Sequence, residues 1–175
     1  MDKLDIVTDE SGNKVVLLPE IIFSNKQNIN WDDVENYLGK YVGELIEIAE
    51  TRDIIYIGNK FPDEYGGSSY TRKTKGARAK AKANAAQGIR EMVEIATDKV
   101  YRENHKEKHS EDAHNGWFYY VTRFAIPLYN NEKKTGEYNV YSACLVVNHA
   151  ANGKMYLYDV VDIKKEASNP LKTIK

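Results

Sequence analysis

The pattern of apolar and polar positions gives the chain an N-terminal hairpin, a helical middle and a C-terminal part rich in β-forming residues. Residues 4–23 contain two β-rich runs around an Asp-Glu-Ser-Gly-Asn segment, which predicts a small hairpin. In residues 31–50 apolar side chains recur at steps of three and four, which predicts an amphipathic helix. Asn30 can cap this helix, with Asp32 and Asp33 in its first turn.

The middle of the chain predicts one short strand and two further helices. Residues 53–58 (DIIYIG) form the strand, and residues 59–69 carry a proline and a Gly-Gly pair that predict a loop. The Ala, Lys and Arg content of residues 73–84 favours a helix. After Gly88, apolar positions predict a second helix from residue 89 towards residue 100.

Three long runs of β-branched and aromatic residues make up most of the last third: 117–129, 138–149 and 154–165. Asn152-Gly153 between the last two is a strong hairpin signal. These runs predict an antiparallel meander, joined by residues 53–58 as a fourth strand. The predicted fold class is therefore α+β, with an N-terminal hairpin and helices packed on a roughly four-stranded antiparallel sheet.

The 175 residues predict a single domain. We expect an N-terminal hairpin and extension over 1–30, a mainly helical region over 31–110, and the meander over 111–170. No run approaches eighteen apolar residues, and the N-terminus lacks the features of a signal peptide. Cys144 alone cannot form an intramolecular disulfide. The expectation is a cytoplasmic protein without a membrane segment.

The register of the meander predicts an aromatic and charged face. If Asn152 and Gly153 form a two-residue turn, His149 lies opposite Tyr156, and alternation separates the two faces. Core residues would include Leu157, Val146, Cys144, Val161 and Ile163. The opposite face would gather Trp117, Tyr119, Arg123, Tyr141, His149, Tyr156, Tyr158, Asp162 and Lys164. Rings stack on unpaired bases and cations neutralise phosphates, so this face suits RNA. The alternative is a solvent face of β-formers, which needs no ligand.

The near-neutral net charge of −1 hides a strong asymmetry. Residues 1–70 hold fourteen acids and six bases, whereas residues 71–110 hold eleven bases and five acids. The densest basic segment, with no acid among them, consists of Arg72, Lys73, Lys75, Arg78, Lys80 and Lys82. Such a segment predicts contact with a polyanion, and Tyr156 and Tyr158 would add stacking surfaces for nucleic acid. The alternative is a solvated helix face.

Candidate chemistry centres on one histidine and one arginine. His105 and His109 have i,i+4 spacing, but the surrounding sequence lacks the HExxH arrangement, so we predict no metal site and no cofactor. His109 and Arg123 are instead suited to metal-independent RNA cleavage by general acid/base chemistry, with Tyr119 and Lys164 assisting. His109 as a surface residue and Arg123 as an ion-paired sheet residue are the alternatives. Cys144 is predicted to be a buried structural thiol.

Four blocks of the sequence resemble one family of domains. They are Ile57–Tyr65 (IGNKFPDEY), Lys80–Ala96 (KAKANAAQGIREMVEIA), Lys108–Pro127 (KHSEDAHNGWFYYVTRFAIP) and Gly153–Glu166 (GKMYLYDVVDIKKE). They look like a domain of large polyvalent proteins of bacteriophages and integrative elements, grouped with the barnase–EndoU–colicin–RelE-like nucleases. The resemblance covers roughly residues 40–170. It implies helices on a four-stranded antiparallel sheet and metal-independent RNA cleavage.

The resemblance also bears on sites and partners. His109 and Arg123 fall at positions that match the family pattern, and Tyr119, Tyr158 and Lys164 lie inside matched blocks. The leading hypothesis is an RNA-targeting nuclease-like domain of phage or mobile-element origin, with RNA as its partner and tRNA as one candidate. A second is a non-catalytic binder or inhibitor of a host defence protein or nucleic-acid enzyme, docked through the acidic front. A third is a capsid- or packaging-associated module.

Overall fold

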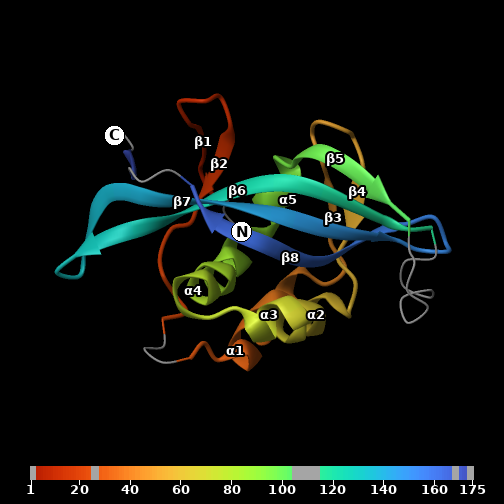
Figure 1. Cartoon of the computed structure of the whole chain (residues 1–175), viewed down its shortest axis with the longest axis horizontal. Coiled ribbons are helices and arrows are strands. Elements are labelled where there is room, and N and C mark those ends of the chain that lie inside the picture. Colours follow the sequence, from red (N-terminus) through yellow and green to blue (C-terminus); the bar gives the residue numbers. More distant parts are fainter. Residues whose placement is uncertain (1–2, 25–27, 104–114, 167–169, 173–175) are drawn as a thin grey trace.

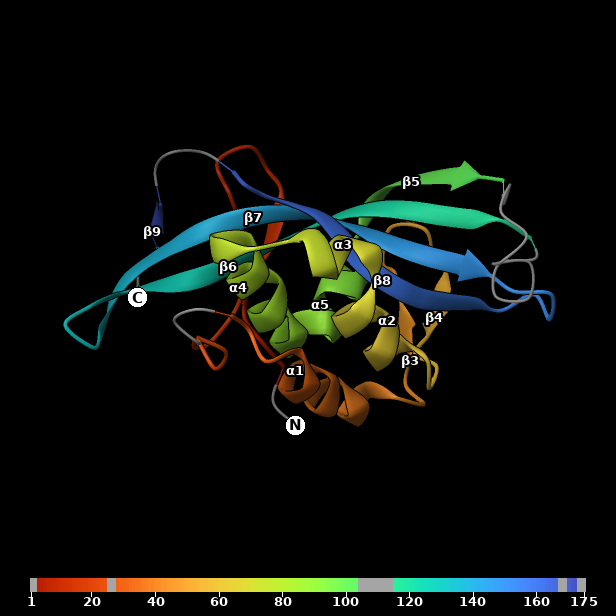
Figure 2. The ribbon, with the colours of Figure 1, turned by 60° about the horizontal axis from the view of Figure 1, so that its bottom comes forward.

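A mixed α/β architecture is seen in the computed structural model, which describes residues 3–24, 28–103, 115–166 and 170–172. Long strands form a twisted sheet, and the helices lie together against one of its faces (Figures 1 and 2). The opposite face carries no helix among the described residues, and we call it the open face. The sheet is therefore a layer with one buried side and one more accessible side.

The sheet contains more strands than predicted. Its described strands are β1 (Ile6–Thr8), β2 (Lys14–Leu17), β3 (Leu45–Glu47), β4 (Ile54–Tyr56), β5 (Thr97–Arg102), β6 (Trp117–Asn130), β7 (Lys133–His149), β8 (Met155–Lys165) and β9 (Leu171–Lys172). The order is β1-β2-β6-β7-β8-β4-β3, with β5 also pairing β6 and β9 also pairing β7. The prediction of roughly four strands is wrong, because short strands from the N-terminal half extend the sheet on both sides.

The central meander and the N-terminal hairpin confirm two predictions. β6, β7 and β8 pair antiparallel in sequence order, and β1 pairs antiparallel with β2. The sheet is not wholly antiparallel, since β2 runs parallel to β6 and β4 runs parallel to β8. The predicted strand at residues 53–58 is thus present as β4, but in the parallel sense.

The helical layer is built from short segments. They are α1 (Trp31–Leu38), η1 (Gly39–Tyr41), α2 (Phe61–Gly67), α3 (Ser69–Lys73), α4 (Gly76–Ala85), η2 (Ala86–Gly88) and α5 (Ile89–Glu94). The Asn30 side chain accepts hydrogen bonds from the backbone N–H groups of Asp32 and Asp33, which confirms the predicted cap. The main core lies between these helices and the sheet and includes Leu38, Tyr65, Met92, Phe124 and Leu145.

Three predicted segment boundaries are wrong. The helix predicted for residues 31–50 ends at Leu38 and is followed by η1. The chain then turns at Gly43, whose φ is +95°, and enters β3. The helix predicted for residues 89–100 ends at Glu94 and is followed by β5. The loop predicted for residues 59–69 contains α2 and the start of α3, because its proline occupies the first turn of α2.

Two irregularities in β8 change the predicted faces. The turn places His149 opposite Met155 rather than Tyr156, and the register then shifts near Tyr158 and near Asp162. Asp162 has a φ of +51°, in keeping with a bulge. On β7, Tyr141 lies opposite Phe124 of β6 and stacks on it in the core, rather than lying on the aromatic face.

Cys144, Val146 and Val161 also change sides. The prediction placed them in the core, but they pack with Trp117, Tyr119 and Tyr158 in a separate small cluster. The β6 half of the predicted face is confirmed, since Trp117 and Tyr119 share a side opposite Tyr120 and Phe124. The prediction failed on β7 because the β6–β7 register places Cys144 and Val146 opposite Val121 and Tyr119, whereas on β8 the bulges shift the faces.

Candidate functional site

A polar row crosses the open face at its middle. Arg123 on β6 lies opposite Ser142 on β7, and Ser142 lies opposite Lys164 on β8. Residues directly opposite one another in antiparallel strands share a face. One apolar cluster flanks this row on each side: Trp117, Val146 and their neighbours on one, and Val15, Leu17 and Ala125 on the other. The row is thus a polar stripe across an otherwise apolar sheet face.

Arg123 is held by a carboxylate that the sequence prediction missed. Its Nε lies 2.8 Å from the Oε1 of Glu166, directly after β8. The Glu166 backbone N–H donates to the carbonyl of Val140 at 2.8 Å, which continues the β7–β8 pairing beyond the end of β8. The two side chains keep 20% and 29% of their exposure, so solvent reaches the pair. Arg123 is therefore ion-paired on the sheet, and its partner lies on the same accessible face.

The signal for Glu166 was present in the sequence. It stands two residues after Lys164, and alternation puts residues i and i+2 of an extended chain on one face. Two of the predicted catalytic residues, Arg123 and Lys164, thus belong to the polar row, and Glu166 joins them. This arrangement places a carboxylate beside a guanidinium and an ammonium-bearing side chain on an accessible surface.

Tyr119, the third predicted catalytic residue, shares the open face with the polar row but lies nearer to Trp117. The guanidinium of Arg102 lies 5.9 Å from its ring centroid. Burial raises the pKa of the Tyr119 hydroxyl, so this group stays protonated at neutral pH and can donate a hydrogen bond. Burial likewise raises the pKa of the Cys144 thiol to about 11, which keeps it protonated and unreactive, as expected of a structural thiol.

His109, the fourth predicted catalytic residue, lies outside the described residues, as do His105 and His114. The remaining histidine, His149, does not join the open face as predicted. Its ring lies 5.5 Å from that of Phe118, which packs against the main core. The prediction that the His149 imidazole lies on the aromatic face is therefore wrong.

The two tyrosines predicted to bind nucleic acid lie close together on β8. The Tyr158 ring packs edge-on against Trp117 with centroids 5.0 Å apart. The Tyr156 ring lies 5.7 Å from that of Tyr56 on β4. Both residues line a cavity at the edge of β8.

The predicted basic segment lies in the helical layer. Arg72, Lys73, Lys75 and Arg78 are exposed and Lys80 is half-buried. Arg72, Lys75 and Lys80 line a groove of about 640 Å³ that also includes the indole of Trp31. No carboxylate is among the described residues that line this groove. Positive charge beside an aromatic ring in one groove is typical of surfaces that bind single-stranded nucleic acid.

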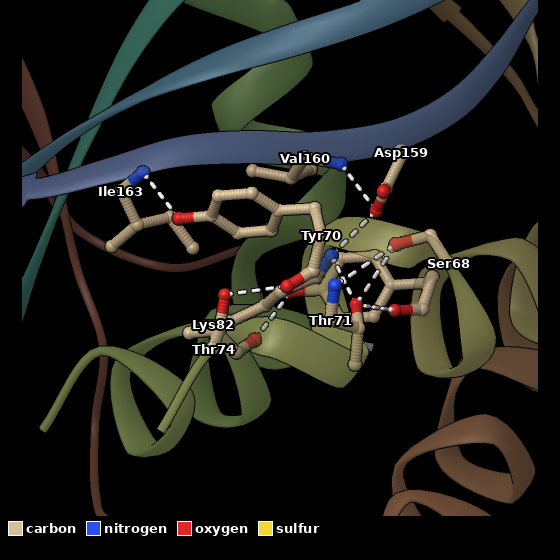
Figure 3. A network of polar contacts seen from close by, with 9 residues as sticks. Ser68, Tyr70, Thr71, Thr74, Lys82, Asp159, Val160 and Ile163 are labelled. Atoms are coloured by element: carbon tan, nitrogen blue, oxygen red, sulfur yellow. Dashed lines mark hydrogen bonds and ion pairs between the residues drawn. The ribbon is translucent and has the colours of Figure 1, made fainter. Parts of the chain in front are cut away.

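Lys82, assigned to the same basic segment, is fully buried and is not available to RNA in this structure. Figure 3 shows its side chain reaching from α4 towards Asp159 on β8. Its Nζ lies 2.6 Å from the Asp159 Oδ1 and donates to the Thr71 Oγ1 at 2.6 Å. Asp159 also accepts the Val160 N–H at 2.8 Å. The prediction for Lys82 is wrong because its ammonium stabilises a buried carboxylate.

This buried pair belongs to a network that fixes the helices to β8. Thr71 donates to the carbonyl of Tyr65 at 2.6 Å, and the Tyr70 hydroxyl accepts the Ile163 N–H at 2.9 Å (Figure 3). Burial lowers the pKa of Lys82 and raises that of Asp159, in each case against the stabilising effect of the partner. The network joins α3 and α4 to the strand that carries Lys164.

Among the described residues, no three or more His, Cys, Asp or Glu side chains gather as metal ligands would. Within the same ranges, no helix has the length and apolar character needed to cross a membrane. Comparison with known proteins adds no relative: no family model, no curated protein and no solved structure matches this chain.

Proposed function

We propose that this protein binds RNA and cleaves it without a metal ion, on the open face of the sheet. The observation that carries the proposal is the Arg123–Glu166 pair, which sits in a polar row with Lys164 on an accessible surface. A carboxylate beside two cations supplies a proton acceptor and fixed positive charge in one place. A 2′-hydroxyl needs groups of these two kinds when it attacks the adjacent phosphate.

The reaction assigns a separate role to each group. Glu166 accepts the proton of the 2′-hydroxyl while the 2′-oxygen forms a bond to phosphorus. Arg123 and Lys164 stabilise the charge that develops on the phosphate oxygens. The bond from phosphorus to the 5′-oxygen then breaks, and that oxygen takes a proton from a general acid. His109, which the sequence predicts to be catalytic without assigning it as acid or base, could supply this proton. The neutral hydroxyl of Tyr119 is the alternative among the described residues.

The basic groove supports the proposal by offering a path for the RNA backbone. α3 is tied to β8 through Tyr70 and Ile163, and Ile163 directly precedes Lys164 of the polar row. Arg72 follows Tyr70 by two residues and lines the groove. An RNA strand that crosses the edge of β8 can therefore contact cations of both the helical layer and the sheet.

A triple variant tests this path. Arg72→Ala, Lys75→Ala and Lys80→Ala together should weaken the binding of a short single-stranded RNA and lower the salt dependence of its affinity. Each phosphate contact on single strands contributes about 0.7 to the slope of log K against log salt, so removing three should reduce the slope by about 2. Fluorescence anisotropy at several salt concentrations measures this slope.

The matched control removes three exposed lysines of equal charge far from the groove, Lys133, Lys134 and Lys172. We expect a much smaller change in slope for this variant. Equal slopes for the two triple variants would show that RNA does not follow the groove.

Cleavage itself is tested with total RNA and tRNA in the presence of EDTA. Wild-type protein should cleave under these conditions. Binding without cleavage would instead favour the non-catalytic alternative and direct the next experiment to a pull-down. Absence of both binding and cleavage would contradict the proposed function.

A further inference from the structure

A cavity of about 250 Å³ lies at the edge of β8, beside the point where the chain leaves β4 and enters α2. Tyr156 and Tyr158 line one part of it, and Lys60 and Glu64 from the start of α2 line another. A Cβ atom on Gly58 would lie 3.3 Å from the Tyr156 ring, so the glycine lets this ring pack directly against the backbone. The cavity thus has aromatic walls and polar groups at one side.

Asn148 on β7 lines the same cavity and carries an unpaired polar atom. The residue is only 8% exposed. Its Oδ1 is buried and has no hydrogen-bond partner in the part of the chain that the structure describes. Buried polar groups in proteins are normally paired, because an unpaired acceptor loses its water without compensation. Because Asn148 lines the cavity, a rotation of its amide would turn this unpaired oxygen towards a ligand that supplies the missing hydrogen bond.

The other lining groups restrict what that ligand can be. One lysine and one glutamate contribute opposite charges, so the cavity does not select an anion such as phosphate. Ligand cavities typically measure about 300–1,000 Å³, and this one lies just below that range, which suits a single ring system. Tyrosine rings stack on the faces of nucleobases. A flat, uncharged heteroaromatic ring fits both the walls and the size.

An asparagine amide carries both a donor and an acceptor. Adenine carries a matching pair of groups, because its N6–H can donate to the amide oxygen and its N7 can accept from the amide N–H. Rotation about the last side-chain bond is only loosely restricted, so the amide can turn to meet this edge. We propose that the cavity binds an unpaired adenine of RNA, with Asn148 reading its edge and Tyr156 or Tyr158 stacking on its ring. This assignment rests on the proposed RNA function.

The first test uses free nucleotides, which probe the cavity without the basic groove. AMP should bind more tightly than UMP, and Asn148→Ala should raise the Kd for AMP about tenfold while changing the Kd for UMP less than twofold. The side-chain amide signal of Asn148 in NMR titrations reports the contact. Asn148→Leu, which keeps the packing volume, serves as a second variant should the alanine variant fold poorly.

Asn139→Ala on the same strand is the matched control and should leave both affinities unchanged. The thermal midpoint of Asn148→Ala should not fall by much, because the substitution removes an unpaired buried group rather than a hydrogen bond. Equal binding of AMP and UMP, absence of AMP binding, or an Asn148→Ala variant with unchanged AMP affinity would overturn the assignment.

RNA hexamers separate the two proposals. A wild-type preference for oligo(A) over oligo(U) that Asn148→Ala abolishes would support the adenine site. Hexamers that bind through the groove with no preference would overturn the adenine site and leave the proposed function standing. AMP binding that depends on Asn148, with no binding or cleavage of any RNA, would support the cavity as a mononucleotide site and overturn the RNA function.

Discussion

Replacing Lys82 with methionine should destabilise the protein by about 3–5 kcal/mol, the cost typical of removing one partner from a buried ion pair. The substitution leaves the Asp159 carboxylate in a buried site with 3% side-chain exposure and no counter-charge. It also removes the hydrogen bond from the ammonium to Thr71. Urea unfolding followed by circular dichroism at pH 7 measures the change in free energy of unfolding.

The defect should depend on pH in a defined direction. Burial already raises the pKa of Asp159, and Lys82 opposes that effect, so the pKa rises further in the variant. A carboxyl group with a raised folded pKa stabilises the fold below its unfolded pKa and loses that contribution as pH rises through the folded value. The difference in stability between wild type and Lys82→Met should therefore be largest at neutral pH and shrink towards acid.

Two controls make the result specific. Lys80→Met removes a half-buried lysine from the same helix and should change the free energy of unfolding by no more than about 0.5 kcal/mol. Lys82→Met combined with Asp159→Leu removes both charges and should recover much of the lost stability. A Lys82→Met variant as stable as Lys80→Met would show that the pair does not hold α4 to β8.

The position of Lys82 illustrates what the sequence could and could not predict. Counting charge along the chain placed it with five other cations. The local composition carries different information, since five alanines flank Lys82, at positions 79, 81, 83, 85 and 86, and all five are buried. The partner carboxylate lies 77 residues away, and no local pattern identifies it.

Features that depend on neighbouring residues were predictable. The Asn30 cap, the N-terminal hairpin and the β6–β8 meander follow from short-range signals and are present. The short strands β3 and β5 were missed because three to six residues carry little periodicity of their own. They are strands because β3 pairs with β4 and β5 pairs with β6.

The candidate site shows the same division. Alternation along β6 correctly placed Tyr119 and Arg123 on one face, because that strand contains no bulge before Pro127. The side assigned to β7 was wrong because its register with β6 cannot be inferred from alternation within one strand. The faces of β8 were partly wrong because each bulge in β8 shifts the pairing by one residue. Glu166 was overlooked because it follows two lysines and looked like a strand end.

Glu166→Gln should reduce the rate of RNA cleavage about 10²–10⁴-fold, the contribution typical of a general base. The amide keeps the size of the side chain and can still accept a hydrogen bond from Arg123, but it cannot take the 2′-hydroxyl proton. The effect should fall on kcat with little change in KM, because the basic groove that binds the backbone is untouched. Single-turnover cleavage of a labelled RNA in EDTA measures it.

Stability separates this catalytic role from a structural one. The Arg123–Glu166 pair is partly exposed, and such pairs contribute only about 0–1 kcal/mol, so Glu166→Gln should unfold close to the wild-type midpoint. Glu132→Gln, an exposed residue in the β6–β7 turn, is the matched control and should cleave at the wild-type rate. Full activity in Glu166→Gln would exclude Glu166 as the base. A loss of activity that tracks a loss of stability would show that the pair only holds the end of β8 against β6.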